Sequence, residues 1–334
     1  MRTITVALGE KTYNIEIAAG LLDQIGAKAR VLSQAVKAAI ISDSNVDPLY
    51  GERLERSLAA SGFEVTRIVF AAGEQSKNLT VLGQVYDELA RAGLTRSDLI
   101  LTLGGGVPGD LGGFAAATFL RGIDFIQVPT SLLAQIDSSV GGKVAIDLPS
   151  GKNLAGSFYQ PKAVFIDPDL LKTLPLRFLH DGLAEAIKYG CIRDAGLFAQ
   201  IAAVKSDQEL LEQADIIIET CCNIKARIVE KDEFDTGERM LLNFGHTIGH
   251  AIEKCCGFTT YTHGEGVGIG MVQMTRQTEK LGLTAAGTAE ELSRVLKKFA
   301  LPVSAVFDAQ EILQAMVLDK KKSGKKINLV IIEK

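Results

Sequence analysis

Short apolar runs alternate with amphipathic stretches through the first half of the chain. Residues 1–17 alternate apolar and polar positions like a pair of strands. From about residue 38 the pattern becomes strand, loop and helix, repeated: the runs KAAIISDSN, FEVTRIVF and DLILTLGGG alternate with helical periodicity over residues 47–61 and 79–92, and IDFIQVPTS and AVFID add two strands. Strands that alternate with helices of this length predict a parallel sheet with right-handed crossovers.

Helical periodicity replaces the strand signals after about residue 170. It continues through LAEAIKYG and LLEQADIIIETCCNIKARIVEKD to AEELSRVLKKFA, and a final apolar run, INLVIIEK, predicts one late strand. A chain of 334 residues also exceeds the size at which one core usually stays undivided. We therefore expect an α/β N-terminal domain with a parallel-sheet core, residues 1–169, and a mainly α-helical C-terminal domain, residues 170–334.

Composition and charge narrow the class of protein. Hydrophobic residues make up 47% and charged residues 23% of the chain, with 33 glycines, as in ordinary soluble α/β proteins. A net charge of -4 gives no general attraction to nucleic acid or to an anionic membrane, so neither is an expected partner. The N-terminus lacks the features of a signal peptide and no apolar run approaches 18 residues, so we expect a cytoplasmic protein.

The five cysteines include two adjacent pairs and no CxxC spacing, which argues against a disulfide framework and against a thiolate zinc site. We interpret them as structural. They are Cys191, Cys221, Cys222, Cys255 and Cys256.

A glycine cluster follows the DLILTL strand and precedes a helical stretch. Gly104, Gly106 and Gly109 satisfy GxGxxG, and Pro108 suits the first turn of a helix. Backbone amides at a helix N-terminus favour a pyrophosphate, although such glycines also serve tight turns and close packing. Asp43, at the end of the KAAIISD strand, is a candidate for binding a ribose, or it caps the following turn.

Lysines and small polar residues crowd into two other loops. GEQSKN supplies Glu74 and Lys77, and PTSLLAQIDSSVGGKVAIDLPSGKN supplies a larger set on a glycine-rich stretch. That set is Asp137, Lys143, Lys152 and Asn153. Lysine and asparagine side chains on tight loops favour phosphate binding, whereas a lysine taken singly is more often a solvated charge.

Three of the four histidines fall within 18 residues. His246 and His250 are spaced i and i+4, so both project from one helical face, and His263 follows in YTHGE. Glu185 and Lys188 are spaced i and i+3 on another helical stretch with apolar surroundings. Two histidines and one glutamate leave a coordination position open, as in a catalytic zinc site. Spacing does not decide which of His246 and His250 is the ligand.

The segment ERMLLNFGHTIGH places four polar residues three or four apart along one helical edge. They are Arg239, Asn243, His246 and His250. This stripe either lines a site or faces solvent.

Across essentially its whole length the sequence resembles the 3-dehydroquinate synthase family, the second enzyme of the shikimate pathway. The matching segments are SDSNV, GEQSK, GGGVPGD, RGIDFIQVPTSLLAQIDSSVGGK, GKN, FYQP, LKTLP, GLAEAIKYG, LLNFGHTIGHAIE, HGE and DKK. The resemblance implies a homodimer that converts 3-deoxy-D-arabino-heptulosonate 7-phosphate to 3-dehydroquinate and phosphate. It implies transient oxidation of the C5 hydroxyl with NAD, phosphate elimination, re-reduction and aldol closure.

Residue roles follow from the same resemblance. Zinc or cobalt is then held by Glu185, His246 and His263, with His250 as an acid-base or hydrogen-bonding neighbour. The implied NAD positions are Asp43, Asn45, Glu74, Lys77, Gly105, Gly106, Val107, Gly109, Asp110, Thr130, Ser131, Lys143, Lys152 and Thr173. The implied substrate and catalytic positions are Asp137, Lys143, Lys152, Asn153, Lys188, Arg239, Asn243, His250 and one of Lys320 and Lys321.

The sequence departs from the family pattern at three positions. Ala72 replaces the proline of PGE, Pro108 replaces the second valine of GGGVVGD, and Phe178 replaces the glutamate of the LPxRE segment. Three alternative functions use similar parts: a related sugar-phosphate cyclase, an NAD- and metal-dependent polyol dehydrogenase, and a non-catalytic NAD-binding or metal-binding protein. Net accumulation of NADH separates the dehydrogenase from the synthase.

Overall fold

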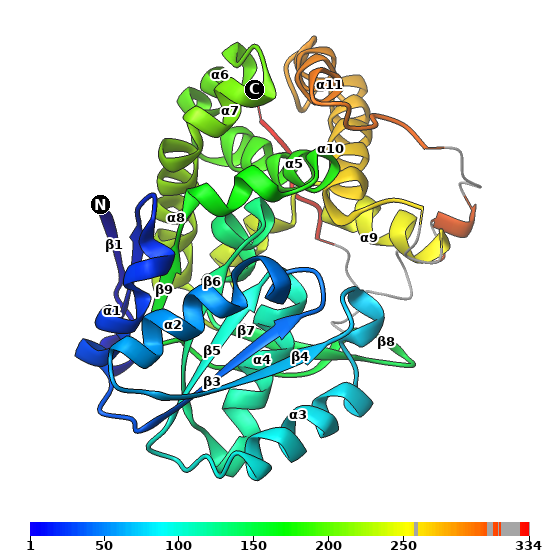
Figure 1. Ribbon diagram of the computed structural model, residues 1–334. Helices are drawn as coiled ribbons and strands as arrows, with labels where there is room; N and C mark the ends of the chain where they lie inside the picture. The colour runs from blue at the N-terminus through cyan, green and yellow to red at the C-terminus, as the bar shows by residue number, and fades with distance from the viewer. Residues whose placement is uncertain (257–259, 306–309, 313, 315–327, 334) are drawn as a thin grey trace. The chain divides into compact units, whose positions relative to one another are not determined.

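The computed structural model describes residues 1–256, 260–305, 310–312, 314 and 328–333. The chain divides into two compact units, Met1–Leu174 with Leu211–Phe234, and Pro175–Leu210 with Asp235–Lys334 (Figure 1). Residues 211–234, which the boundary at residue 170 places in the C-terminal domain, thus group with the first unit. They contain the whole of helix α8 (Ala214–Lys231), whose Asp215 accepts hydrogen bonds from Arg2 of strand β1 (Arg2–Val6).

A seven-stranded sheet forms the centre of the first unit. Its strands run in the order β1-β2-β9-β6-β5-β3-β4. After β1 these are β2 (Tyr13–Ile17), β9 (Ala163–Ile166), β6 (Asp124–Pro129), β5 (Leu99–Gly104), β3 (Lys37–Asp43) and β4 (Glu64–Phe70). β1 pairs antiparallel with β2, and every other neighbouring pair is parallel. The predicted strand pair and parallel sheet are confirmed.

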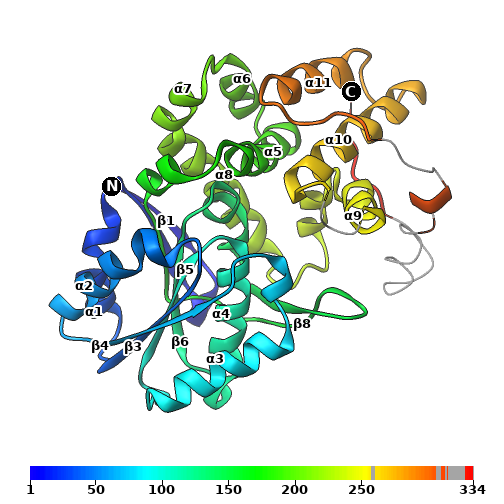
Figure 2. The same ribbon diagram turned by 45° about the vertical axis from the view of Figure 1, so that its right-hand side comes forward.

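Helices cover both faces of this sheet (Figure 2). α1 (Ile25–Leu32) and α2 (Glu52–Ala60) pack on one face, and α3 (Leu79–Arg91) and α4 (Gly106–Thr118) pack on the other. Ile40 of β3 joins the core beneath α2, while its neighbour Ile41 joins the core beneath α4. Burial on both faces explains why β3 and β5 are continuous apolar runs and do not alternate with polar residues.

A two-stranded antiparallel hairpin, β7 (Lys143–Leu148) and β8 (Gly151–Phe158), lies within the stretch predicted as a glycine-rich loop. The prediction of tight loops at this point is wrong, because Lys143, Lys152 and Asn153 lie on strands. Val144 and Ile146 alternate along β7 and are buried in the core with α4. Their spacing of two is the strand signal that the neighbouring glycines obscured.

The second unit is helical, as predicted. It contains α5 (Leu176–Ile192), α6 (Ala195–Ala203), α9 (His246–Cys255), α10 (His263–Lys280) and α11 (Thr288–Lys298). The short helix α7 (Asp207–Glu212) crosses the division between the two units at residue 210. The predicted strand INLVIIEK is wrong over its described part, since residues 328–333 form no strand. The carbonyl of Ile332 instead accepts a hydrogen bond from the Thr284 hydroxyl, and the described residues of this unit offer it no partner strand.

The five cysteines all lie among the described residues and form no disulfide, as expected. Burial raises the pKa of the Cys191 and Cys222 thiols to about 12, which keeps them protonated and unreactive. Within the described ranges, no helix combines the length and the apolar character needed to cross a membrane.

Candidate active site

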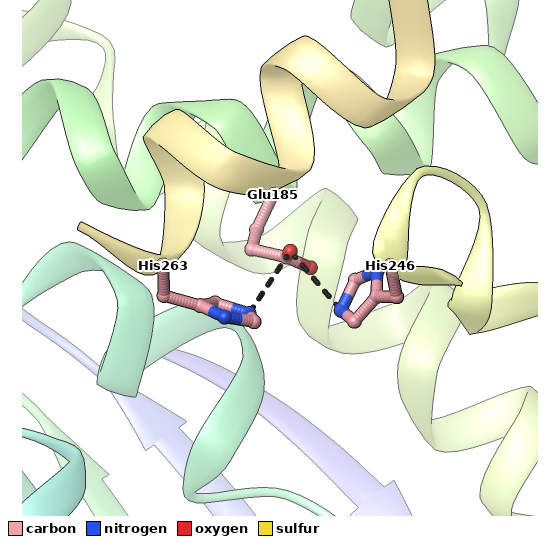
Figure 3. Close-up of side chains that lie close together, drawn as sticks. All are labelled: Glu185, His246 and His263. Carbon is pink, nitrogen blue, oxygen red and sulfur yellow. Dashed lines mark ion pairs between the residues drawn. The ribbon is translucent and has the colours of Figure 1, made fainter. Parts of the chain in front are cut away.

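Two imidazole rings and one carboxylate meet in the second unit. Glu185 comes from α5, and His246 and His263 are the first residues of α9 and α10. The Oε1 atom of Glu185 lies 3.5 Å from His246 Nε2 and 3.6 Å from His263 Nε2, between the two rings (Figure 3). Each residue offers one ligand atom, and these atoms all lie within 4.8 Å of one another.

Two glycines let the three helices approach closely enough for this. Gly245 has a left-handed conformation with φ 79° and directly precedes α9. A Cβ atom there would lie 2.7 Å from the carbonyl oxygen of Val267 in α10. At Gly264, the second residue of α10, a Cβ atom would lie 2.0 Å from the carbonyl oxygen of Asp181 in α5. Side chains at either position would push apart the helices that carry the cluster.

The predicted continuous polar stripe from residue 239 to residue 250 is wrong. Arg239 and Asn243 belong to a separate 3-10 helix, η8 (Glu238–Asn243), which ends before Gly245 turns the chain into α9. Arg239 is buried, whereas Asn243 and His250 are exposed. The shared face of α9 is nevertheless real, since the ring centroids of His246 and His250 lie 5.2 Å apart.

Glu185 and Lys188 form a buried ion pair one helical turn apart, as their spacing indicates. The side chain of Lys188 is 1% exposed and that of Glu185 is 0% exposed, and the Lys188 ammonium contacts Glu185 Oε2. Pairing offsets the cost of burying both charges, and it leaves Oε1 directed toward the histidines.

The two candidate histidine ligands have opposite electrostatic surroundings. Burial and the Lys188 ammonium lower the pKa of His246 to about 3, against the opposing effect of Glu185. Burial also lowers the pKa of His263, but the carboxylates of Glu185 and Glu253 outweigh it and raise that pKa well above its usual value. His246 is therefore a neutral ring, whereas His263 holds a proton that a metal ion would have to replace.

The donor set fits a divalent transition metal. Ligand atoms about 2.0–2.2 Å from a tetrahedral zinc ion lie roughly 3.3–3.6 Å from one another, and the two Nε2 to Oε1 distances, 3.5 and 3.6 Å, match this spacing. Two imidazoles and one carboxylate leave a coordination position for substrate, and they suit cobalt as well as zinc.

In the first unit, the glycine cluster has the predicted strand, turn and helix arrangement. β5 ends at Gly104, Gly105 precedes α4, and Gly106, Val107 and Gly109 lie in the first turn of that helix. The first N–H groups of a helix have no partner within it, so they are available to an anion.

Two of the departures from the family pattern have a local explanation. Pro108 occupies the third position of α4, where the missing N–H of proline costs no helical hydrogen bond. Ala72 donates its N–H to the Ser44 hydroxyl at 3.0 Å, a bond that proline could not form. At the third departure, Phe178 is half exposed on α5, and its neighbour Arg177 forms an ion pair with Glu265 of α10.

Lys77 brings together several of the predicted nucleotide-binding residues. It is 4% exposed. Its Nζ atom lies 3.1 Å from Asp110 Oδ2, 3.2 Å from Glu74 Oε1 and 2.7 Å from Asn153 Oδ1. Burial raises the pKa of Asp110 to about 6 against the effect of Lys77, while the surrounding carboxylates outweigh burial and raise the pKa of Lys77. Glu74 also lies 3.7 Å from the Lys152 ammonium.

Asp43 ends β3 and makes the turn contacts that we considered as an alternative to ribose binding. Its Oδ1 atom accepts hydrogen bonds from the N–H groups of Asn45, at 2.8 Å, and Val46, at 3.0 Å. Three further predicted NAD positions lie on other segments of this unit. Thr130 and Ser131 follow β6. Thr173 ends the 3-10 helix η7 (Pro168–Thr173), and its hydroxyl contacts that of Tyr50.

In the first unit, two charged residues that were not among the predicted site residues contact them. Asp147 of β7 lies 3.9 Å from the Lys77 ammonium and accepts the N–H of Asn153 at 2.8 Å. Lys225 of α8 is 5% exposed and donates to Asp137 Oδ1 at 2.8 Å. Lys225 was detectable, since it occupies a position four residues after Cys221 on the buried face of the helix, where an apolar residue is expected. Lys320 and Lys321 lie outside the described residues.

Comparison with known proteins identifies the family. The 3-dehydroquinate synthase N-terminal model matches residues 67–181, and the C-terminal model of the same enzyme matches residues 182–322. The chain belongs to the 3-dehydroquinate synthase family. A relative from Clostridium acetobutylicum, named 3-dehydroquinate synthase, is 53% identical over 334 residues, which cover 100% of this chain and 94% of the relative.

Solved structures of sugar-phosphate cyclases share the fold. A 2-deoxy-scyllo-inosose synthase, complexed with carbaglucose-6-phosphate, NAD+ and Co2+, aligns with a TM-score of 0.86 and 26% identity over 98% of this chain and 89% of that one. A 2-epi-5-epi-valiolone synthase from Streptomyces hygroscopicus, with NAD+ and Zn2+ bound, gives 0.85 and 27% over 95% and 88% of the two chains. The predicted fold class is confirmed.

Proposed function

We propose that this chain converts 3-deoxy-D-arabino-heptulosonate 7-phosphate to 3-dehydroquinate and phosphate, with NAD and one zinc or cobalt ion per chain. The observation that carries the proposal is the Glu185, His246 and His263 cluster, whose ligand atoms have the spacing of a metal site with an open position. The names of the relatives support the reaction, and the cofactors of the two cyclase structures support NAD and the metal.

A metal ion held there supplies Lewis-acid polarisation of a substrate hydroxyl, and NAD supplies a hydride acceptor that is restored within each turnover. In the second unit, His250 is placed on the same face of α9 as His246, and we assign it proton transfer. Lys188, which is paired with the Glu185 carboxylate, is assigned to substrate together with Arg239 and Asn243.

In the first unit, the proposal assigns the pyrophosphate of NAD to the amides at the start of α4. Lys77 and its carboxylate partners hold the β7 and β8 hairpin at Asn153, which orders the neighbouring lysines. Lys143 and Lys152 then neutralise anionic groups of cofactor or substrate, and Asp137 is assigned to substrate together with its partner Lys225. The expected homodimer and the cytoplasmic location belong to the same proposal.

The test offers the purified protein, NAD and zinc two substrates in parallel, the heptulosonate phosphate and a hexose 6-phosphate. We expect 3-dehydroquinate and phosphate from the first substrate, no net NADH, and no turnover of the second. Preference for the hexose phosphate would indicate a related sugar-phosphate cyclase. Accumulation of NADH in step with product would indicate a dehydrogenase, and either result would overturn the proposal.

A further inference from the structure

Glu253 is a buried carboxylate on α9, and the proposed function gives it no role. It is 4% exposed, and its Oε1 atom lies 3.1 Å from Nδ1 of His263. Gly266 of α10 lies beside it, and a Cβ atom there would be 3.4 Å from Glu253 Oε1, an ordinary van der Waals distance. A carboxylate is costly to bury unless a partner stabilises its charge, and the His263 imidazole is such a partner.

The contact determines which ring nitrogen of His263 faces the cluster. A carboxylate accepts hydrogen bonds, so the proton of the neutral ring lies on Nδ1, and Nε2, which is 3.6 Å from Glu185 Oε1, presents its lone pair. His246 has the same arrangement with a neutral acceptor: its Nδ1 lies 3.1 Å from the carbonyl oxygen of Phe244, and its Nε2 faces Glu185. Both rings are therefore oriented, but only His263 is oriented by a negative charge.

We propose that Glu253 is a positioning residue that fixes the tautomer and orientation of His263 and strengthens it as a metal ligand. The inference rests on the proposed metal site. A carboxylate behind a ligating imidazole increases the electron density on the ligating nitrogen, and loss of such a partner typically weakens metal binding about 10–100-fold. The neutral carbonyl behind His246 lacks this effect, so Glu253 makes the two histidine ligands unequal.

The test measures metal affinity directly, by competition of the metal-free full chain with a chelator for Co2+ and Zn2+. Glu253→Gln keeps an oxygen that can accept the Nδ1 proton but removes the charge, and Glu253→Leu removes both. We expect one metal ion per chain in all three proteins, with affinity about 10-fold lower for Gln and about 100-fold lower for Leu. The visible spectrum of bound Co2+ should shift in the same order.

Glu265→Gln is the matched control. Glu265 also lies in the first turn of α10, but it pairs with Arg177 and caps Thr262 and has no described contact with the His263 ring. We expect this variant to bind metal within about twofold of the unchanged chain, and all variants to unfold at similar temperatures without metal. The control and the unfolding temperatures together distinguish a general loss of helix packing from a weaker bond between His263 and the metal.

Three results would overturn the inference: unchanged affinity in both Glu253 variants, equal loss in Glu265→Gln, or complete loss of stoichiometric binding in Glu253→Gln, which would make Glu253 itself a ligand. Absence of metal binding by the unchanged chain would instead contradict the proposed function.

Discussion

His246 Nε2 lies 3.5 Å from Glu185 Oε1, although the two residues belong to different helices, α9 and α5. Because Glu185 is the proposed anionic ligand of the cluster, Glu185→Gln should lower zinc affinity more than about 100-fold, beyond the effect expected for a residue that only supports a ligand. Metal content after gel filtration checks this. A variant that retains one zinc ion per chain would remove Glu185 from the ligand set.

His246 and His250 share one helical face, and we expect substitutions at the two positions to separate metal binding from turnover. His246→Ala should abolish zinc binding because it removes a proposed ligand, whereas His250→Ala should retain zinc and lose at least about 100-fold in turnover, because His250 is the proposed general acid-base group. Zinc content and phosphate release are measured on both variants. Equal zinc loss in the two proteins would mean that the ligand assignment is wrong.

Lys77 is a buried cation among three carboxylates, and its removal should destabilise the fold. Lys77→Met leaves Glu74, Asp110 and Asp147 close together without their counterion, so we expect a loss of about 3 kcal/mol in the free energy of unfolding. Lys162→Met is the control, because the pair of Lys162 with Asp124 is 46% and 50% exposed and should contribute less than about 1 kcal/mol. Urea denaturation without ligands compares them, and equal midpoints would contradict this reading.

Asp110 makes stability depend on pH in an unusual direction. Its folded pKa, about 6, lies above the ordinary value of 3.8, so the folded chain binds the proton more tightly than the unfolded chain does. The contribution of this group to stability is therefore present below pH 3.8 and is lost as the pH rises to about 6, by at most about 3 kcal/mol. Asp110→Asn should remove this dependence. Because the unchanged chain loses stability as the pH rises and the variant does not, the free energy of unfolding of the variant relative to that of the unchanged chain should rise between pH 4.5 and 6.5. Parallel pH profiles would show that Asp110 titrates normally.

The sequence predicted the elements with strong hydrophobic periodicity. β3 and β5 were recognisable as continuous apolar runs because the sheet buries both of their faces, and α5 and α11 by helical spacing. The β7 and β8 hairpin was missed because glycines and polar residues flank a short alternating segment. The final apolar run, over residues 328–333, has no partner strand among the described residues, which no local pattern reveals.

The candidate site was predictable in its residue types and only partly in its geometry. Histidine spacing identified the shared face of His246 and His250, and the i and i+3 spacing identified the Glu185 and Lys188 pair. The packing of α9 against α10 is a tertiary contact that helical spacing within either segment does not reveal, so Glu253 could not be linked to His263. The break at Gly245 reflects its left-handed conformation, which the helical reading of that segment overlooked.

The most direct test of the account is phosphate release from the heptulosonate phosphate during titration of zinc into metal-free protein with NAD present. We predict no release without metal, a rise that ends at one zinc ion per chain, and reversal by chelator, with no net NADH at any point. Phosphate release that is independent of metal, or the absence of release at full zinc occupancy, would contradict the account.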